Sequence, residues 1–362
     1  MQSLESLLEK MVQVEASDLH LKVGSPPVFR LNGDLQMFDQ EHLGPEVTKD
    51  YAASLMSDRQ IRQFSEISEV DFAYSAPEVG RFRVNVYRQR GSISIAVRRV
   101  ATRIPSFEEL MLPGVVETLS AEPRGIVLVT GATGSGKTTT LAAMINYINS
   151  HMRRHIVTIE DPIEILHEDK ESIINQREVG LDTESYSSSL KHVLRQDPDV
   201  ILIGEMRDLE TVRTALTAAQ TGHFVLSTLH TIDVAETVNR IIDFFPLYQQ
   251  NQVRIMLAGS LKGIISQRLL SRAGGEGRVP AVETMVVTGR IRQMILDPQQ
   301  TSAIASALQE GDYYGMQSFD QSLLSLYEEG LVTFHDASQV ATSPHDFKLL
   351  VQSSGYDVNP DT

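Results

Sequence analysis

The chain has 362 residues, of which 41% are hydrophobic and 22% are charged, and it contains no cysteine. These proportions are typical of a globular protein large enough for two domains, and the lack of cysteine excludes disulfides, thiolate zinc sites and cysteine nucleophiles. The formal charge of −15 argues against a general nucleic-acid binder, which needs a basic surface. No apolar run approaches the ~20 residues that span a bilayer, and the acidic start lacks an export signal, so we expect a cytoplasmic protein.

The first hundred residues predict an α+β domain with an antiparallel sheet. Apolar residues fall first at helical spacing and then at alternating positions, with turn residues between the alternating runs. The expected elements are a helix over residues 4–12, a strand over 18–23, a hairpin over 28–38 around Asn32-Gly33, a helix over 45–66, and strands over 70–75, 81–90 and 92–100.

Arginines are concentrated near the end of this region, although the chain as a whole is acidic. Arg81 and Arg83 alternate with Phe82 and Val84, so the two arginines share one face of a strand. One interpretation is a solvated basic face. The other is a surface that meets phosphate or a carboxylate-rich neighbour. The six arginines are Arg81, Arg83, Arg88, Arg90, Arg98 and Arg99.

Residues 131–138 read GATGSGKT and fit the phosphate-binding P-loop pattern G-x-x-x-x-G-K-[ST]. An apolar strand precedes them and a helical pattern follows, which disfavours the alternative of a glycine-rich turn that binds nothing. Backbone N–H groups and the helix dipole would then face phosphate oxygens, Lys137 would reach the β- and γ-phosphates, and the Thr138 hydroxyl would hold Mg²⁺. The predicted nucleotide contacts are Gly131, Ala132, Thr133, Gly134, Ser135, Gly136, Lys137, Thr138 and Thr139.

The rest of the chain predicts a parallel sheet covered by helices on both faces. Residues 104–123 are interpreted as a linker, and apolar strands alternate with helices from residue 124 to about residue 233. The expected strands are 126–129, 155–160, 199–205 and 224–230, with helices over 185–196 and 208–221. Beyond them we expect two helices over 234–272 broken at Phe245-Pro246, a loop over 273–278, a late strand over 282–288, helices over 289–308, 318–329 and 333–350, and a flexible tail over 351–362.

Acidic residues follow two of these strands, where ligands of parallel sheets bind. After the strand over 155–160, either Glu164 or Glu160 could orient or deprotonate a water molecule beside the γ-phosphate; the alternative is a set of helix-capping acids. After the strand over 199–205, Gly204 occupies the place where many P-loop enzymes carry a metal-binding aspartate, and Glu205 remains. Magnesium would then depend on Thr138, ATP and water, with Glu205 close by or acting through water.

Two histidines bracket the strand over 224–229. They lie about 23 Å apart if the strand is extended, so they cannot share a metal ion. His230, at the carboxyl end, is placed to contact or sense the γ-phosphate. His223 is expected to be a packing or hydrogen-bonding residue.

Four segments together resemble the Walker A, Asp box, Walker B and His box of the secretion ATPase superfamily: GATGSGKT, TIEDPIE, DVILIGEMRD and GHFVLSTLHT. SDLHL, SPP, GRFRVN and GMQSFDQSLLSLYEEGLVTFHDA resemble the PilT/PilU-type type IV pilus retraction ATPases. This resemblance implies a PAS-like domain over residues 1–103 and a RecA-like ATPase domain over 124–350. It also implies a homohexamer with ATP between subunits.

The same resemblance assigns roles to individual residues. It implies Glu164 as the catalytic base, Glu205 as the residue that handles Mg²⁺ and water, and N-terminal arginines that reach the nucleotide, with Arg81, Arg83, Arg98 and Arg99 as candidates. The implied partners are an inner-membrane platform protein of the PilC type and a paralogous retraction ATPase, at the inner-membrane pilus machine.

One segment departs from the family pattern. PilT proteins carry an AIRNLIRE motif, and the matching stretch Arg290–Asp297 keeps only Ile291, Arg292 and Ile295. This difference favours a PilU-like accessory motor. The alternatives are an assembly or secretion ATPase, which typically has a longer N-terminal region and a four-cysteine module, and a ring subunit that binds ATP without hydrolysis. A DNA-translocating ring conflicts with the acidic charge.

Overall fold

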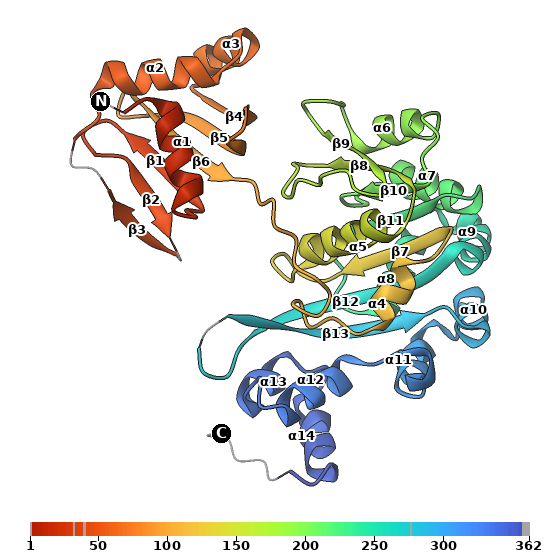
Figure 1. The fold of residues 1–362 in the computed structure, drawn as a ribbon. Coiled ribbons are helices and arrows are strands. Elements are labelled where there is room, and N and C mark those ends of the chain that lie inside the picture. Colours follow the sequence, from red (N-terminus) through yellow and green to blue (C-terminus); the bar gives the residue numbers. More distant parts are fainter. Residues whose placement is uncertain (1, 32, 39–40, 276, 357–362) are drawn as a thin grey trace. The chain divides into compact units, whose positions relative to one another are not determined.

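The computed structural model of the protein describes residues 2–31, 33–38, 41–275 and 277–356. Contacts divide them into two units (Figure 1): one holds residues up to Thr102 together with Glu164–Leu166, and the other holds Arg103–Ile163 and the described residues from His167 onward. Each unit has its own sheet and its own hydrophobic core. None of the helices formed by the described residues combines the length and apolar character that crossing a bilayer requires.

The first unit is built on an antiparallel sheet. Its elements are α1 (Leu4–Gln13), β1 (Asp18–Lys22), β2 (Val28–Leu31), β3 (Asp34–Met37), α2 (Pro45–Leu55), α3 (Asp58–Ile67), β4 (Glu69–Ala76), β5 (Gly80–Gln89) and β6 (Ser92–Arg99). The six strands are ordered β3-β2-β1-β6-β5-β4. Apolar residues on alternate strand positions, such as Phe82 and Val84, pack with α1 and α2 into one core. The predicted α+β organisation with an antiparallel sheet is confirmed.

Two local differences from the predicted elements have simple causes. The helix expected over 45–66 is two helices, because Ser57 begins a new one: its N–H and its hydroxyl donate to Gln60 Oε1 at 2.7 and 2.8 Å. This capping arrangement stabilises a helix start and so interrupts the apolar periodicity. The predicted hairpin is present, with Leu31 paired to Asp34, while Asn32 lies outside the described residues.

The second unit contains the predicted P-loop and a mostly parallel sheet. Its elements are α4 (Val115–Ser120), β7 (Gly125–Thr130), α5 (Lys137–His151), β8 (His155–Glu160), β9 (Ile173–Glu178), α6 (Tyr186–Val193), β10 (Val200–Ile203), α7 (Leu209–Gln220), β11 (Phe224–Leu229), α8 (Val234–Asp243), α9 (Leu247–Ser260), β12 (Leu261–Ser271), β13 (Arg278–Val286), α10 (Gly289–Leu296), η1 (Thr301–Ala303), α11 (Ile304–Gln309), η2 (Asp312–Tyr314), α12 (Phe319–Glu328), α13 (Phe334–Val340) and α14 (Pro344–Ser353).

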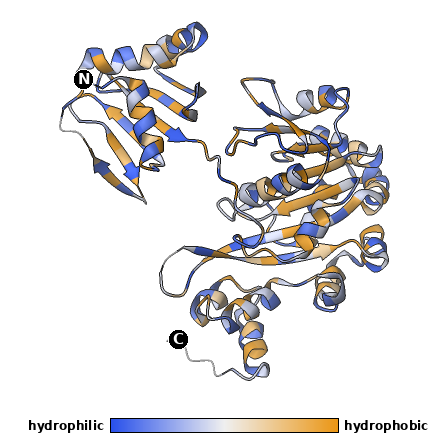
Figure 2. Ribbon diagram, viewed as in Figure 1, coloured by the Kyte–Doolittle hydropathy of each residue, from blue (hydrophilic) through white to orange (hydrophobic). Residues whose placement is uncertain are grey.

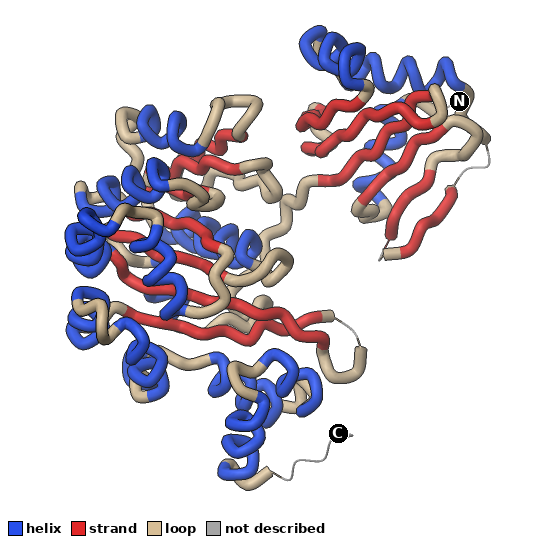
Figure 3. Tube along the Cα trace, turned by 180° about the vertical axis from the view of Figure 1, so that it is seen from behind, coloured by secondary structure: helices blue, strands red, loops and turns tan. Residues whose placement is uncertain are grey.

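The seven strands are ordered β13-β12-β7-β11-β10-β8-β9, and only β13 runs antiparallel to its neighbour. Helices lie on both faces of this sheet (Figure 3). Val127 and Val129 of β7 face a core with α4 and α5, whereas Ile126 and Leu128 face a larger core that includes α6 to α11. The central strands are therefore apolar along their length, as Figure 2 shows. The predicted parallel sheet with two covered faces is confirmed.

The predicted second helix within residues 234–272 extends too far, whereas the predicted late strand over 282–288 is present as β13. The second of the two predicted helices ends at Ser260, and residues 261–271 form β12, which pairs with both β7 and β13. Such a strand is buried on both faces, so its apolar run cannot be distinguished from a buried helix by periodicity. The edge strand β9, which pairs with β8, was also missed, because its sequence IINQRE mixes polar and apolar residues.

The C-terminal helices form a separate core against the β12–β13 pair. Leu270, Val279 and Ala281 of these strands pack with apolar side chains of α12, α13 and α14. The last helix continues to Ser353, three residues past the predicted end at residue 350, and residues 357–362 of the predicted tail lie outside the described part of the chain. The predicted loop over 273–278 lies between β12 and β13, except that Arg278 already belongs to β13; Glu276 is not described.

Candidate functional site

The glycine-rich loop lies between β7 and α5, where the sequence places it. Gly131 has a φ of 140°, and an added Cβ would lie 2.4 Å from the Gln267 carbonyl oxygen and 2.6 Å from the Ser135 hydroxyl. A side chain does not fit there, so glycine allows the loop to fold closely against β12. The result is a loop of closely packed backbone at the start of a helix, the arrangement that binds phosphate in P-loop proteins.

Lys137 begins α5, and its ammonium group lies under the loop. The residue is 9% exposed, and Nζ donates to the carbonyl oxygens of Gly131 at 2.7 Å and Ala132 at 2.9 Å. Burial lowers the pKa of Lys137, and the nearby carboxylate of Glu205 opposes this shift. Thr138, the next residue, is exposed. The structure therefore places Lys137 close enough to Glu205 for their opposite charges to interact.

Two cavities border the loop. The first, of about 470 Å³, extends from Thr139 to the segment before α4, and it is within the size range of small-ligand sites. The second, of about 380 Å³, lies against residues 131–135. The first cavity is lined in part by Met111, Leu112, Leu269, Arg272 and Arg278, and the second by Ile232, Arg268 and Val340. Apolar walls with arginines beside a phosphate-binding loop suit a nucleotide.

Glu205 follows β10 and is paired on both carboxylate oxygens. It is 7% exposed; Oε1 forms an ion pair with Arg207, and Oε2 lies 3.1 Å from His230 Nε2. His230 follows β11, the parallel neighbour of β10, so the carboxyl ends of the two strands bring these residues together. His223, at the other end of β11, instead places Nδ1 3.0 Å from the Ala218 carbonyl, which agrees with its predicted hydrogen-bonding role.

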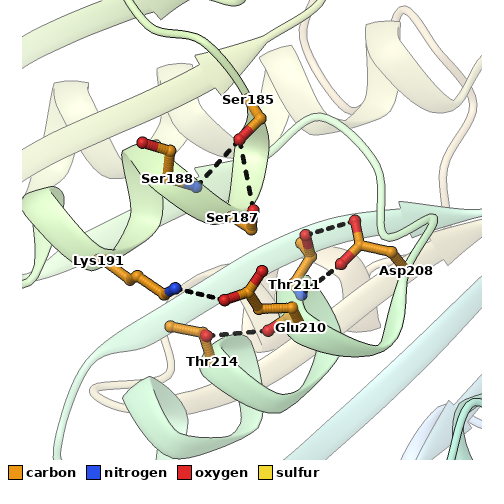
Figure 4. A network of polar contacts seen from close by, with 8 residues as sticks. All are labelled: Ser185, Ser187, Ser188, Lys191, Asp208, Glu210, Thr211 and Thr214. Carbon is orange, nitrogen blue, oxygen red and sulfur yellow. Dashed lines mark hydrogen bonds and ion pairs between the residues drawn. The ribbon is translucent and has the colours of Figure 1, made fainter.

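The loop that carries Arg207 is anchored where α7 begins. Asp208 is the N-cap of α7, and its carboxylate accepts hydrogen bonds from the N–H and the hydroxyl of Thr211, both at 2.8 Å (Figure 4). Lys191 of α6 forms an ion pair with Glu210 in the first turn of α7. The Asp208 cap fixes the start of α7, directly after Arg207, whereas the exposed Lys191–Glu210 pair lies on the helix surface outside the site.

The local packing explains why residue 204, directly before Glu205, is a glycine. A Cβ at Gly204 would lie 2.8 Å from the Tyr186 hydroxyl and 3.2 Å from the Ile159 carbonyl oxygen. Tyr186 of α6 thus fills the space that an aspartate side chain would need. Burial raises the pKa of Tyr186, and the charges of Asp161 and Glu205 raise it further, so the phenol stays neutral beside the acids.

Replacing Gly204 by alanine is expected to destabilise the protein by about 1–3 kcal/mol, because the new methyl group overlaps the Tyr186 hydroxyl. A second substitution, Tyr186→Phe, removes that hydroxyl and is expected to restore most of the loss. Thermal unfolding followed by circular dichroism measures both effects. Gly259→Ala in α9 is the control, because a Cβ there meets no atom within 4 Å. Equal melting temperatures for Gly204→Ala and wild type would contradict this account.

The acids of the predicted Asp box take different positions. Glu160 ends β8, and its Oε1 accepts hydrogen bonds from the Thr158 hydroxyl at 2.6 Å and the Gln176 amide at 3.0 Å. Asp161 and Glu164 are exposed, and Glu164 belongs by its contacts to the first unit. Neither of the two cavities described above is lined by Glu164. The role of Glu164 as the catalytic base stays a prediction.

Three arginines and one aspartate of the first unit form a row across four strands. Arg83 lies opposite Arg98, Arg98 opposite Asp18, and Asp18 opposite Arg30. Asp18 Oδ1 accepts a hydrogen bond from Arg98 Nε at 2.8 Å; burial raises the pKa of Asp18, but this bond and that of Ser17 bring it below its usual value. Arg83 is exposed and pairs with no acid that the structure describes. That this face meets phosphate or a carboxylate-rich neighbour, and is not only a solvated basic face, stays a prediction.

The stretch that departs from the AIRNLIRE motif forms most of α10. Its retained residues Ile291 and Ile295 are buried, and Arg292 Nε donates to the Ala258 carbonyl at 3.1 Å. The three positions kept from the motif therefore hold α10 against α9.

Sequence reasoning missed the polar side chains that β12 and β13 bury, among them Glu283. This residue is 7% exposed, and its Oε1 accepts a hydrogen bond from the Val234 N–H at 2.8 Å, where α8 begins. Burial raises the pKa of Glu283 to about 7. A single acid within the apolar run VETMVVT is the signal that would have identified it.

Glu283→Gln is expected to gain stability over wild type as the pH rises. The carboxyl ionises near 4.5 in the unfolded chain and near 7 in the folded one, so wild type loses stability as the pH rises between these values. Glutamine keeps an acceptor for Val234 and does not ionise. Thermal unfolding gives the difference in the free energy of unfolding between variant and wild type. This difference should shift in favour of the variant by up to about 3 kcal/mol between about pH 5 and about pH 8. Glu329→Gln, at an exposed position, is the control; an identical difference at both pH values would contradict the assignment.

The comparisons with known proteins agree with this site. The family described as type II/IV secretion system protein matches residues 2–337. The chain is 44% identical over 344 residues to a Pseudomonas aeruginosa protein named type IV pilus retractation ATPase PilT, covering 95% of this chain and 99% of that one. It is 41% identical over 348 residues to the type IV pilus ATPase PilU of the same organism, covering 96% and 91%.

A solved structure extends the agreement from sequence to fold. The crystal structure of the pilus retraction motor PilT with bound ADP is similar to this chain with a TM-score of 0.89 and 44% identity, over 96% of this chain and all of that one. Identity and fold thus agree along nearly the whole length. The chain belongs to the type II/IV secretion ATPase family and, within it, to the PilT/PilU type.

Proposed function

We propose that this protein is the motor that couples ATP hydrolysis to type IV pilus retraction. The observation that carries the proposal is the grouping of Lys137, Glu205 and His230 next to the glycine-rich loop, in a chain related along its length to proteins named as pilus ATPases. Retraction means depolymerisation of the pilus into pilin subunits, the process behind twitching motility. A relative from Neisseria gonorrhoeae, 46% identical over 306 residues, is named twitching motility protein.

ATP would bind with its phosphates on residues 131–138 and its base in the first cavity. That cavity begins at Thr139 and ends at the apolar segment around Leu112, which suits a base that stacks on apolar side chains. Lys137 must exchange its hydrogen bonds to Gly131 and Ala132 for bonds to phosphate oxygens. Since the ammonium already lies under the loop, the exchange requires a small movement.

The donor set fits Mg²⁺ bound together with ATP. Among the residues that the structure describes, no group of three or more His, Asp or Glu side chains is placed to hold a metal ion alone. Mg²⁺ does not need such a group, since it keeps several waters and takes other ligands from phosphate. The Thr138 hydroxyl would hold it directly and Glu205 through water. When bound, the ion neutralises phosphate charge.

In the proposed reaction, Glu164 removes a proton from the attacking water and Glu205 orients water and metal. His230 contacts the γ-phosphate and reports its presence to Glu205, whose Oε2 it already meets at 3.1 Å. In a homohexamer with ATP between subunits, an arginine of the neighbouring subunit completes the site. Arg83 is our first candidate, ahead of Arg81 and Arg98, because Arg98 is paired with Asp18.

The motor would work as a ring at the cytoplasmic side of the inner membrane, bound to a platform protein of the PilC type. Residues 1–103 and 124–350 would be its moving domains, and ATP binding would rotate one against the other. Residues 104–123 would move with the second domain, because Val116 and Leu119 of α4 pack into its core. The separate cores of the two units support this division. A paralogous retraction ATPase is a second partner, and we expect no nucleic acid.

Counting pili in a deletion strain tests the proposal. Loss of a retraction motor leaves excess pili, whereas loss of an assembly or secretion ATPase removes them. Complementation against a paralogue then separates the two retraction roles: a PilU-like accessory motor does not restore twitching alone. ATP turnover by the purified protein excludes a ring subunit that binds nucleotide without hydrolysis. Absence of pili in the deletion strain would refute the retraction motor.

A further inference from the structure

Arg268 of β12 contacts three elements that are far apart in the sequence. Its guanidinium carbon lies 3.8 Å from the ring centroid of Phe319 in α12. One Nη group donates to the carbonyl of Val340, the last residue of α13, and the other lies 3.5 Å from the carbonyl of Ile232, in the loop that follows His230. The same side chain lines the second cavity, opposite the P-loop.

The geometry of this side chain requires an arginine. A guanidinium donates in a fixed planar fork and stacks on an aromatic ring, which an ammonium group does not do. Burial lowers the pKa of Arg268, and the acids Glu283, Asp320 and Asp233 oppose the shift, so the charge is held by surrounding carboxylates. The residue is therefore fixed in place by charge, stacking and directional hydrogen bonds together.

The preceding residue fixes β12 to the P-loop helix. Side chains alternate along a strand, so Gln267 points away from Arg268. Gln267 is 2% exposed, and its Nε2 donates to Thr140 Oγ1 at 2.9 Å in the first turn of α5. The backbone carbonyl oxygen of Gln267 is the atom that a Cβ at Gly131 would meet. One strand thus holds the P-loop helix through one side chain and the C-terminal helices through the next.

The contacts of the loop must change when phosphate binds. Lys137 has to leave the carbonyls of Gly131 and Ala132. In the described part of the chain, Ser135 Oγ and Gln267 Oε1 are buried without a hydrogen-bond partner, which costs free energy and favours a rearrangement that satisfies them. Both residues line both cavities. Nucleotide binding therefore acts directly on the wall to which Gln267 and Arg268 belong.

We propose that Arg268 is a positioning residue that couples the nucleotide site to the C-terminal helices α12–α14. The inference rests on the proposed function, because it requires ATP at the P-loop. Bound nucleotide orders the cavity wall, and Arg268 transmits this order to Phe319 and Val340. Coupling between sites is reciprocal, so the packing of α12–α14 in turn holds Ile232, and with it the His230 loop, in position for nucleotide binding.

Hydrogen–deuterium exchange with and without MgADP tests the coupling. In wild type, the amides in the first turn of α5 and those of α12–α14 are both expected to exchange more slowly when nucleotide is bound, by a factor of up to about 5. Arg268→Lys keeps the charge but loses the fork and the stack, so α5 should stay protected while α12–α14 lose the response. Arg240→Lys is the matched control, because Arg240 stacks on Phe244 at 5.1 Å outside the site. It should behave as wild type.

Steady-state kinetics separates positioning from simple structural support. Arg268→Lys is expected to raise the KM for ATP about 5-fold, with a melting temperature close to that of wild type. A merely structural role would lower the melting temperature and leave KM unchanged. If Arg268→Lys does not fold, Phe319→Leu removes the same stack from the partner side and should give the same loss of response in α13 and α14.

The outcomes distinguish this inference from the site on which it rests. If nucleotide protects neither α5 nor α12–α14 in wild type, the P-loop assignment fails. If it protects α5 alone in wild type, or if α12–α14 still respond in Arg268→Lys, the coupling through Arg268 is wrong and the P-loop assignment stands.

Discussion

Lys137→Ala is expected to abolish ATP hydrolysis by the purified protein. Its ammonium group is buried under the glycine-rich loop, in the field of the Glu205 carboxylate, where it can meet the phosphates of a bound nucleotide. Loss of one preorganised charged donor in such a site lowers turnover about 100-fold to 1,000-fold. Release of inorganic phosphate at saturating MgATP measures the effect. Retraction and twitching should be lost in a strain that carries the variant.

Lys191→Ala is the matched control for this substitution. Lys191 forms an ion pair with Glu210 on the α6–α7 surface and takes no part in either cavity. Its removal should leave turnover near that of wild type. Because Lys137 also donates to two carbonyls of the loop, melting temperatures must be compared to confirm that the alanine variant is folded. Turnover by a folded Lys137→Ala protein at the wild-type rate would refute the site.

Glu164→Gln is expected to trap ATP rather than to prevent its binding. The amide cannot accept the proton of the attacking water, so kcat should fall about 100-fold to 10,000-fold, as is usual when a general base is removed. Nucleotide affinity should change little, because a base acts on water and not on the phosphates. Acid quenching of the isolated complex, followed by separation of ATP from ADP, should recover mostly ATP.

The substitution Glu160→Gln tests which of the two acids, Glu160 or Glu164, activates the attacking water, a choice that the sequence leaves open. Glu160 Oε1 already accepts hydrogen bonds from Thr158 and Gln176, which gives it a structural role at the end of β8. We therefore expect Glu160→Gln to lower the melting temperature more than kcat, the opposite of Glu164→Gln. If Glu160→Gln instead traps ATP and Glu164→Gln turns over normally, the base has been assigned to the wrong carboxylate.

Features that depend on neighbouring residues were predictable from the sequence. The P-loop needs only a strand, a few glycines and a helix in succession, and all of these lie within residues 125–151. The meeting of Glu205 and His230 was also predictable, because the carboxyl ends of parallel strands share one edge of the sheet. Each of these inferences uses only local pattern and a general rule of sheet topology.

What the sequence alone determined about this protein is its parallel sheet, the glycine-rich loop between a strand and a helix, and the position of Glu205 at the carboxyl end of a neighbouring strand. Only the tertiary structure decided that residues 261–271 are a strand and that Tyr186 occupies the space beside Gly204. It also decided that Gln267 is hydrogen-bonded to Thr140, 127 positions away. The physical reason is that burial on both sides erases periodicity, and that side-chain packing joins segments whose separation along the chain carries no signal of their contact.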